Sequence, residues 1–387
     1  LSGPDFFNAQ IELNGQLWAG NVEIHVKSSD WYAHNHQEDR NYDNVILHVV
    51  WEDDIGVYRK DGGQIPTLSL KNYIPVQVLE NYQKLFNLKN HRFINCENDF
   101  DKVDGFIRNN WLDRLFIERL EQKSVYINEL LRYTNNNWEQ VLFLMLLKSF
   151  GSKNNREIFV EIGKSIDFSI IRKLYKKPLQ MESLLLGQAN LLETTIDDDQ
   201  YLSELKKEYT FLSHKFNLIS VFKSPEYFRL RPMNFPTIRL AQLSAIYAEN
   251  NNLFHSLIEN NELDFQEYFK VGTSQYWDTH YNFGKNSKKG KKKISNSFLN
   301  LLIINTIIPL KFAYNRYKGA QDNEGLFKMM AKIKKEENSI IANFDKLETS
   351  ILSAKDSQAY LQLYNNYCTK DKCLDCAIGV SLLNVKV

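Results

Sequence analysis

The chain has 387 residues, enough for two or three domains with sizeable cores. Lys and Arg number 48 against 47 Asp and Glu, so the overall charge does not indicate a nucleic-acid partner, and only local patches can. A hydrophobic content of 43% with 25% charged residues is typical of a soluble globular protein. Four cysteines exclude a disulfide scaffold and favour the reducing cytoplasm.

The first 75 residues read as a small mixed α/β module. Two predicted strands, 5–13 and 16–27, flank Asn14-Gly15, a strong signal for a two-residue hairpin loop. Ser29 is a plausible N-cap for a short helix. The apolar run at 44–51 predicts a strand covered on both faces, and a further strand or hairpin is expected after it, at the sheet edge.

The pattern becomes helical after about residue 75. The apolar spacing predicts helices at 138–151, 181–192, 201–216 and 235–251, each followed by Gly, Asn or Pro stops. The run 298–312 is too short for a bilayer and predicts a buried helix, so no membrane is expected. The predicted class is α+β, with a core at 1–75 and a large all-α region at 76–387.

The second predicted strand carries a polar face in an otherwise apolar sequence. Glu23, His25 and Lys27 alternate along it and therefore point to one side. Asp5 opens the neighbouring strand. Two carboxylates from adjacent strands can hold Mg²⁺ or Mn²⁺, and a nearby cation can orient water or stabilise a phosphate. These are the groups that metal-dependent phosphodiester hydrolysis needs.

The order of these residues resembles the PD-(D/E)XK nuclease superfamily, whose motif is an Asp on one hairpin strand and Glu-x-Lys on the next. Pro4-Asp5 supplies the first half and "EIHVK" the second. His25 stands where the family has Lys, and Lys27 lies one step further on the same face. The resemblance implies a restriction-endonuclease-like core with Asp5, Glu23, His25 and Lys27 as catalytic residues, whose usual preceding helix would lie in an N-terminal segment that we expect to be missing before Leu1.

The hairpin register weighs against this interpretation. With a two-residue loop at Asn14-Gly15, Asp5 lies opposite Ile24, on the wrong face from Glu23. The nuclease hypothesis therefore requires a bulge near Asp5, or a longer loop. The alternative is that Glu23, His25 and Lys27 form the solvated face of an edge hairpin.

Three other histidines lie close by in sequence. On a helix, His34 and His36 would point about 200° apart and could not share a ligand site, so a solvated or substrate-facing helix is expected. His48 lies in an apolar strand and is interpreted as a core histidine.

A longer pattern covers nearly the whole chain. The string "GPDFFNAQI…WAGNVEIHVKSSDWYAHNHQEDRNYDNVILHVVW" is similar to the bacterial family called domain of unknown function 2851. The stretches "LLLGQANLL", "RLRPMNFPTIRLAQL", "YWDTHYNF", "INTIIPLKFAY" and "DSQAYLQLYNNYCTKDKCLDCAIG" also fit it. The resemblance implies a cytoplasmic bacterial protein, carries no established activity, and implies a segment before "GPDF".

The cysteines suggest a second site. Cys368, Cys373 and Cys376 have C-x4-C-x2-C spacing, which suits zinc or an iron–sulfur cluster, and Cys96 would be the fourth ligand. The trio also resembles the cluster of iron–sulfur exonucleases, in which the distant Cys precedes the nuclease core instead of following it. Free thiols or core residues are the alternative.

A lysine-rich loop and an arginine pair are the candidate nucleic-acid contacts. The stretch "KNSKKGKKK" contains six lysines, of which Lys288, Lys289, Lys291, Lys292 and Lys293 are the candidates for phosphate contacts. Aromatic residues just before it, from Tyr276 to Tyr281, could stack on bases. Arg229 and Arg231 suit phosphate contacts or carboxylate pairing equally. A solvated lysine loop is the alternative.

Three functions follow from these observations. The first is a metal-dependent nuclease that acts on DNA or RNA. The second is a non-catalytic nucleic-acid-binding or scaffold protein with a degenerate core, and the third is a metalloprotein in which the cysteines matter. The sequence does not fix the substrate or the oligomeric state.

Overall fold

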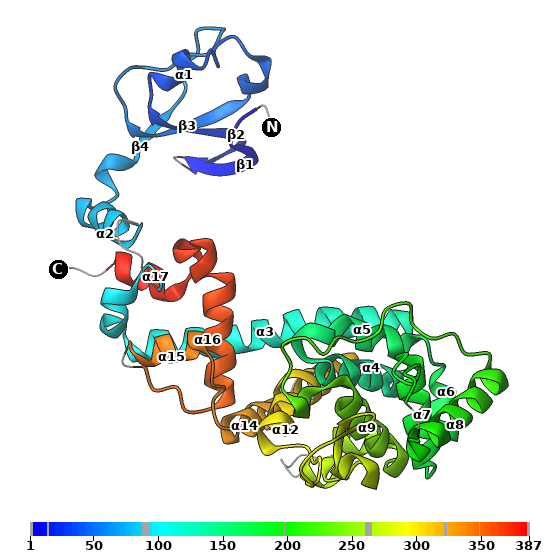
Figure 1. The fold of residues 1–387 in the computed structure, drawn as a ribbon. Coiled ribbons are helices and arrows are strands. Elements are labelled where there is room, and N and C mark those ends of the chain that lie inside the picture. The colour runs from blue at the N-terminus through cyan, green and yellow to red at the C-terminus, as the bar shows by residue number, and fades with distance from the viewer. Residues whose placement is uncertain are drawn as a thin grey trace. The chain divides into compact units, whose positions relative to one another are not determined.

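The computed structural model describes residues 3–13, 15–86, 93–196, 198–259, 265–320, 323–347 and 349–384. It confirms the α+β class, with a small sheet near the N-terminus and a large helical region (Figure 1). Contacts divide the chain into two compact units. Unit 1 contains Leu1–Arg108 and Tyr367–Val387, and unit 2 contains Asn109–Asn366. The sequence predicted a domain boundary at residue 75, where strands give way to helices. In the structure, the residues up to Arg108 and the segment from Tyr367 onward belong to the same unit as the sheet.

Unit 1 contains a four-stranded mixed sheet. Its strands are β1 (Phe6–Leu13), β2 (Gln16–Lys27), β3 (Val45–Glu52) and β4 (Thr67–Ser69), in spatial order β1-β2-β3-β4. β1 and β2 are antiparallel, whereas β2–β3 and β3–β4 are parallel. The predicted hairpin, a strand near 44–51 and an edge strand after it are therefore all present. Asn14 lies outside the described residues, but Leu13 pairs with Gln16, as a two-residue loop requires.

A bulge interrupts the hairpin near its open end. Ala9 pairs with Gly20, in the register set by the loop, but Phe6 pairs with Val22, which is one residue out of that register. Asn8 absorbs the extra residue in a left-handed conformation with φ of 54°, and its N–H donates to Asn21 Oδ1 at 3.2 Å. Asparagine tolerates this conformation better than most residues do. The bulge that the nuclease hypothesis required is thus present.

A short helix and loops cover one face of the sheet. Helix α1 (Asp30–Ala33) and the 3₁₀ turn η1 (Arg40–Tyr42) follow β2, and Trp31 and Tyr42 pack with Val45, Val57 and Ile65 in a small core. Ser29 precedes α1 as expected. It makes no side-chain cap, because its hydroxyl donates to Asp54 Oδ2. The opposite face is more open, with Ile24 43% and Val26 66% exposed, so β3 is not fully covered on both faces.

The rest of unit 1 joins segments from both parts of the chain. Helix α17 (Ala377–Leu383) packs against α2 (Val76–Phe86), and Asn81 Nδ2 donates to the carbonyl of Leu383. Asn95 Nδ2 donates to Asp371 Oδ1 at 2.9 Å. Three 3₁₀ turns complete this part: η3 (Glu97–Lys102), η7 (Cys368–Lys370) and η8 (Cys373–Asp375).

Unit 2 is helical and contains the larger core. Its first helix, α3 (Gly105–Tyr133), begins before the boundary between the units. The four predicted helices appear as α4 (Trp138–Phe150), α7 (Pro178–Gln188), α8 (Gln200–Phe216) and α9 (Pro236–Glu249). The others are α5 (Ser152–Lys164), α6 (Phe168–Lys173), α10 (Leu253–Glu259), α11 (Gln266–Phe269), α14 (Glu324–Lys332), α15 (Ser339–Asp345) and α16 (Ala354–Asn366).

The most apolar stretch forms a longer helix than predicted. Helix α12 (Asn296–Leu302), the π-helical η6 (Ile303–Ile307) and α13 (Ile308–Tyr317) run on continuously for 22 residues. Length and composition alone would let this helix cross a membrane, but 72% of its most apolar window is buried in the protein. Pro309 does not end this helix; it lies at the start of α13, just after the π-helical segment. The 3₁₀ turn η4 (Pro232–Asn234) lies between α8 and α9, and the turn η5 (Gln275–Asp278) and the short strands β5 (His280–Asn282) and β6 (Lys285–Asn286) lie between α11 and α12.

Candidate metal centre

The bulge brings the two predicted carboxylates together at the open end of the hairpin. The Asp5 N–H donates to Glu23 Oε2 at 3.1 Å, and the Ile24 N–H donates to Asp5 Oδ2 at 2.9 Å. One oxygen of each carboxylate thus accepts a hydrogen bond from a backbone N–H, and the other oxygen takes no part in these two bonds. Asp5 is exposed, whereas Glu23 is buried. A regular hairpin would place these two side chains on opposite faces of the sheet. The bulge therefore answers the objection that the hairpin register raised against the nuclease hypothesis.

His25 lies at the centre of a chain of imidazoles. Its Nδ1 is 2.8 Å from His48 Nε2, and its Nε2 is 3.0 Å from His34 Nδ1. His48 is opposite Glu23 in the β2–β3 ladder and is fully buried, as predicted for a core histidine. The same His25 Nε2 is 3.5 Å from Glu23 Oε1. His48 therefore fixes the ring of His25, which leaves the Nε2 edge facing the other imidazoles and the carboxylate.

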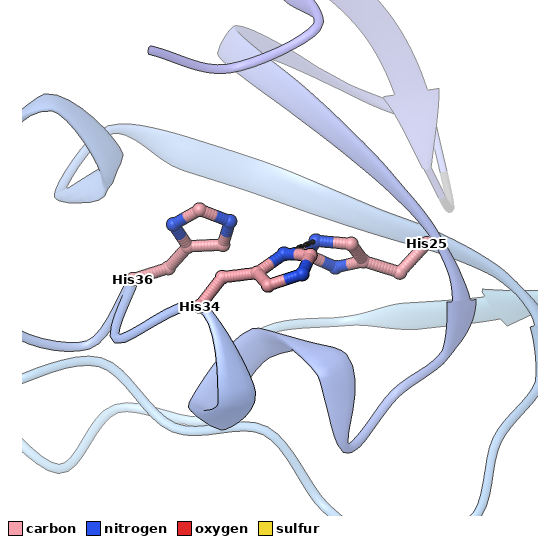
Figure 2. A group of neighbouring side chains, drawn as sticks. All are labelled: His25, His34 and His36. Atoms are coloured by element: carbon pink, nitrogen blue, oxygen red, sulfur yellow. Dashed lines mark hydrogen bonds between the residues drawn. The ribbon is translucent and has the colours of Figure 1, made fainter. Parts of the chain in front are cut away.

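The prediction that His34 and His36 cannot share a site is wrong. It assumed a helix through both residues, but α1 ends at Ala33 and Asn35 turns left-handed with φ of 58°. The turn directs both rings toward His25 (Figure 2). One ring nitrogen from each of His25, His34 and His36 lies within 4.8 Å of the other two, and His36 Nε2 is 3.4 Å from Glu23 Oε1.

Burial disfavours the charged forms of four side chains of the cluster, Glu23, His25, His36 and His48. Burial raises the pKa of Glu23 to about 7, with the nearby Asp5 charge adding to the rise and the Asp5 N–H opposing it. Burial and the neighbouring imidazoles lower the pKa of His36 and of His48 to about 4, and also lower the pKa of His25. Neutral imidazoles have lone pairs available, as metal binding requires. The donors present fit a divalent transition ion, since imidazole suits Zn²⁺ and carboxylate suits Mn²⁺.

Aromatic packing holds the histidine face in place. Tyr42 stacks on His36 with ring centroids 3.8 Å apart, and Trp31 contacts both His36 and His48 edge-on or tilted. Trp31 is 1% exposed, so the imidazoles rest on the small core of unit 1. This support explains why an exposed turn can present its side chains in a defined orientation.

Lys27 is not part of the histidine–carboxylate cluster. Its side chain is exposed, and it forms none of the ion pairs found among the described residues. Its backbone N–H donates to Asp30 Oδ2, which starts the turn into α1. Sequence reasoning missed His34, His36 and His48 as members of the site. The signal available in the sequence was the local density of histidines, since the stretch from His25 to His48, both included, contains four of the chain's eight.

The four cysteines gather in unit 1, although they lie far apart in the sequence. Burial raises the pKa of Cys96 and of Cys368, and the neighbouring thiols add to each rise. Burial is the largest cause and brings the Cys96 pKa to about 12. Asn95 Nδ2 donates to Cys373 Sγ at 3.6 Å. Across the ranges that the structure covers, only the histidine trio has ligand atoms all within 4.8 Å, so the thiols are grouped more loosely.

The lysine-rich loop divides into structural and exposed members. Lys292 is 2% exposed, and its ammonium donates to the carbonyls of Gly290 and Asp278 and lies 4.0 Å from the Tyr281 ring centroid. The prediction that Lys292 contacts phosphate is therefore wrong. Lys291 pairs with Asp278 at 2.6 Å. The remaining candidates, Lys288, Lys289 and Lys293, are exposed.

The aromatic residues before this loop form internal contacts. Trp277 is fully buried and donates to Glu182 Oε1 at 2.6 Å, and Tyr276 stacks on His280. These contacts make Trp277 a core residue, not a base-stacking one. Arg229 and Arg231 are both exposed, and Arg229 lies over the Phe228 ring.

The fold and the cluster define an α+β protein whose small sheet carries histidine and carboxylate donors suited to a metal ion. Residues 1–339 match the family model described as "Protein of unknown function (DUF2851)". The chain belongs to this family, as the sequence resemblance predicted. Neither a curated protein nor a solved structure matches the chain.

Proposed function

We propose that unit 1 is a metal-dependent phosphodiesterase centre acting on DNA or RNA. The observation that carries the proposal is the bulge at Asn8, which puts Asp5 beside Glu23 and so supplies two carboxylates at the position where the resemblance to PD-(D/E)XK nucleases needs them. The parallel strand β3 after a short helix is also the order that this resemblance implies. His25 takes the place of the family's Lys.

The donor set favours particular ions. His25, His34, His36 and Glu23, with Asp5 beside them, would hold Mn²⁺ or Zn²⁺ in preference to Mg²⁺, because three nitrogen ligands suit transition ions better than the oxygen-preferring Mg²⁺. When bound, such an ion supplies Lewis-acid chemistry toward water and phosphate. His48 orients the His25 ring, as groups behind metal ligands commonly do. His34 is the exposed member and would meet the substrate first.

The test is cleavage of end-labelled DNA and RNA with Mn²⁺, Zn²⁺ or Mg²⁺. We expect divalent-dependent cleavage by the full chain, lost at least 100-fold in Glu23→Gln and His25→Ala. The control is His214→Ala, an exposed histidine of unit 2, which should cleave like the original. Failure of every ion to support cleavage on any nucleic acid would refute the proposal.

A second function is favoured by one specific contact. Asp5 Oδ2 already accepts the Ile24 N–H, so part of this carboxylate serves the backbone, as a degenerate and non-catalytic centre would allow. In that case the chain would bind a metal ion and nucleic acid without cleaving it. Stoichiometric Zn²⁺ binding that depends on His25 and His36, together with salt-sensitive binding of nucleic acid and no cleavage, would identify this function.

The cysteines are proposed as a separate structural metal site in either case. Cys96, Cys368, Cys373 and Cys376 offer four thiols in one partly buried region of unit 1, the number that structural zinc or an iron–sulfur cluster uses. Purified protein should contain zinc in excess of the histidine site or absorb near 400 nm. The Cys376→Ser variant should lose that zinc or that absorption. A cytoplasmic location remains a prediction from the cysteine content.

A further inference from the structure

Unit 2 contains a cavity lined by basic side chains. Its volume is about 640 Å³, which falls within the usual size range for small-molecule sites. Five cations line it, from helices α3, α4, α5 and α9: Lys123, Lys148, Lys153, Arg156 and Arg239. None of the described residues that line the cavity is acidic. Its walls also include serines and, on one side, the apolar side chains of Met145, Phe298, Leu301 and Leu302.

Among the described residues these cations form no close ion pair with a carboxylate, although the charges of Glu157 and Glu129 partly offset the burial of Lys148, and that of Glu336 the burial of Lys123. Within the described ranges, no Asp or Glu oxygen lies within 4.0 Å of the charged nitrogens of Lys148, Lys153, Arg156 or Arg239. Lys148 Nζ instead lies 3.3 Å from the centroid of the Tyr126 ring. Arg239 is the buried member of this set, and a buried charge without a counter-ion is costly, whereas Lys153 and Arg156 are exposed. The pattern indicates that an anion completes the cavity.

Arg239 gives the clearest sign of an incomplete site. The residue is 7% exposed, and its guanidinium stacks 3.6 Å from the Phe298 ring centroid. One terminal nitrogen donates to Gln242 Oε1 at 2.9 Å and the other to Asn234 Oδ1 at 2.6 Å, but Nε is buried without a partner. Burial lowers the Arg239 pKa to about 10, because nothing negative offsets the lost hydration. An anion bound in the cavity beside the guanidinium would offset its charge without reaching the buried Nε.

The rim adds donors of a second kind. Helix α5 begins at Ser152, which lines the cavity and has a left-handed φ of 51°. The first N–H groups of a 13-residue helix have no acceptor within the helix, and together they favour a phosphate. Lys153 and Arg156, one turn apart on the same helix, are exposed and flank this end.

We propose that this cavity binds the phosphate group of a small phosphorylated organic molecule, with the apolar wall taking the organic part. A phosphate monoester suits the site better than a single carboxylate, because it carries nearly two charges and three acceptor oxygens for several unpaired cations. The proposal concerns unit 2 alone and is independent of the nuclease proposal.

The test is isothermal titration of the full chain with adenosine 5′-monophosphate and, as the matched control ligand, adenosine. EDTA in the buffer removes any contribution from a metal centre in unit 1. We expect the monophosphate to bind at least tenfold more tightly than adenosine and to be displaced by inorganic phosphate. The double variant Lys153→Ala/Arg156→Ala should weaken binding at least tenfold, whereas the exposed pair Lys328→Ala/Lys334→Ala should not.

Arg239→Lys retains the charge but loses the fork geometry and should also weaken binding. If that variant fails to fold, the Lys153/Arg156 pair still decides the matter, because both side chains are exposed. Equal binding of monophosphate and adenosine, or equal loss in the two double variants, would overturn the proposal. Binding of a single-stranded oligonucleotide that the monophosphate does not displace would also overturn it, in favour of a nucleic-acid contact.

Discussion

The histidine–carboxylate cluster of unit 1 and the basic cavity of unit 2 are built in opposite ways. The cluster depends on irregular backbone, since a bulge at Asn8 and a left-handed turn at Asn35 bring its side chains together. The cavity is lined mainly by regular helices whose side chains meet because the helices pack. Burial disfavours the charged forms of side chains in the cluster, whereas the cavity is lined by lysines and arginines that form no close ion pair with a carboxylate among the described residues. Metal donors and anion receptors thus make different demands on the backbone.

The first prediction breaks the irregular backbone of unit 1. Asn8→Val places a β-branched residue at a φ of 54°, which such residues avoid, so the bulge should be lost and Asp5 should move away from Glu23. Asn8→Gly keeps the conformation available. We expect a loss of divalent-dependent cleavage of at least 100-fold for Val and less than fivefold for Gly. Retained cleavage in the Val variant would show that the bulge is dispensable.

The second prediction concerns a buried acid in the regular unit. Glu182 accepts hydrogen bonds from Trp277 and Tyr201, and burial raises its pKa to about 7 from 4.5. The folded chain therefore binds a proton that the unfolded chain releases between these pH values. Stability from this group is complete below pH 4.5 and is lost as the pH rises through 7, by about 3 kcal/mol. Urea unfolding should show this fall, and Glu182→Gln should remove the part due to Glu182, leaving the part due to Glu23, whose pKa is raised over the same range.

The third prediction tests the tight packing around the cysteines. A Cβ at Gly379 would lie 2.1 Å from the carbonyl oxygen of Cys373, so Gly379→Ala must displace backbone in η8. We expect a loss of roughly 1 to 3 kcal/mol in unfolding free energy, typical of overpacking. Gly325 in α14 has open space, and Gly325→Ala should instead stabilise by about 0.5 to 1 kcal/mol. Equal effects in chemical unfolding would contradict this account.

The smallest effect separates two lysines of one loop. Lys292 is buried and bonded to carbonyls, so Lys292→Ala should destabilise unit 2 by roughly 1 to 2 kcal/mol. Lys288 is exposed, and Lys288→Ala should change stability by less than about 0.5 kcal/mol. Thermal unfolding of both variants measures the difference. A destabilisation by Lys288→Ala as large as that by Lys292→Ala would contradict the division of the loop into structural and exposed lysines.

Regular structure was predictable from the sequence, and irregular structure was not. Periodicity located α4, α7, α8 and α9, and the loop signal at residues 14 and 15 located the hairpin, because both depend on local spacing. The convergence of His34 and His36 depends on where α1 ends, which a helical pattern does not fix. The burial of Lys292 depends on carbonyls and an aromatic ring that only the folded loop supplies.

Unit 1 is discontinuous, and this has a consequence for synthesis on the ribosome. The segment that packs against α2 and brings three of the cysteines to Cys96 begins at Tyr367, after the whole of unit 2. A nascent chain must therefore wait, on the order of ten seconds or more at elongation rates of about 5 to 20 residues per second, before the first-made unit can be completed. During that interval the surface of α2 and the Cys96 thiol have no native cover. Chaperone capture or thiol oxidation would act most strongly in this window.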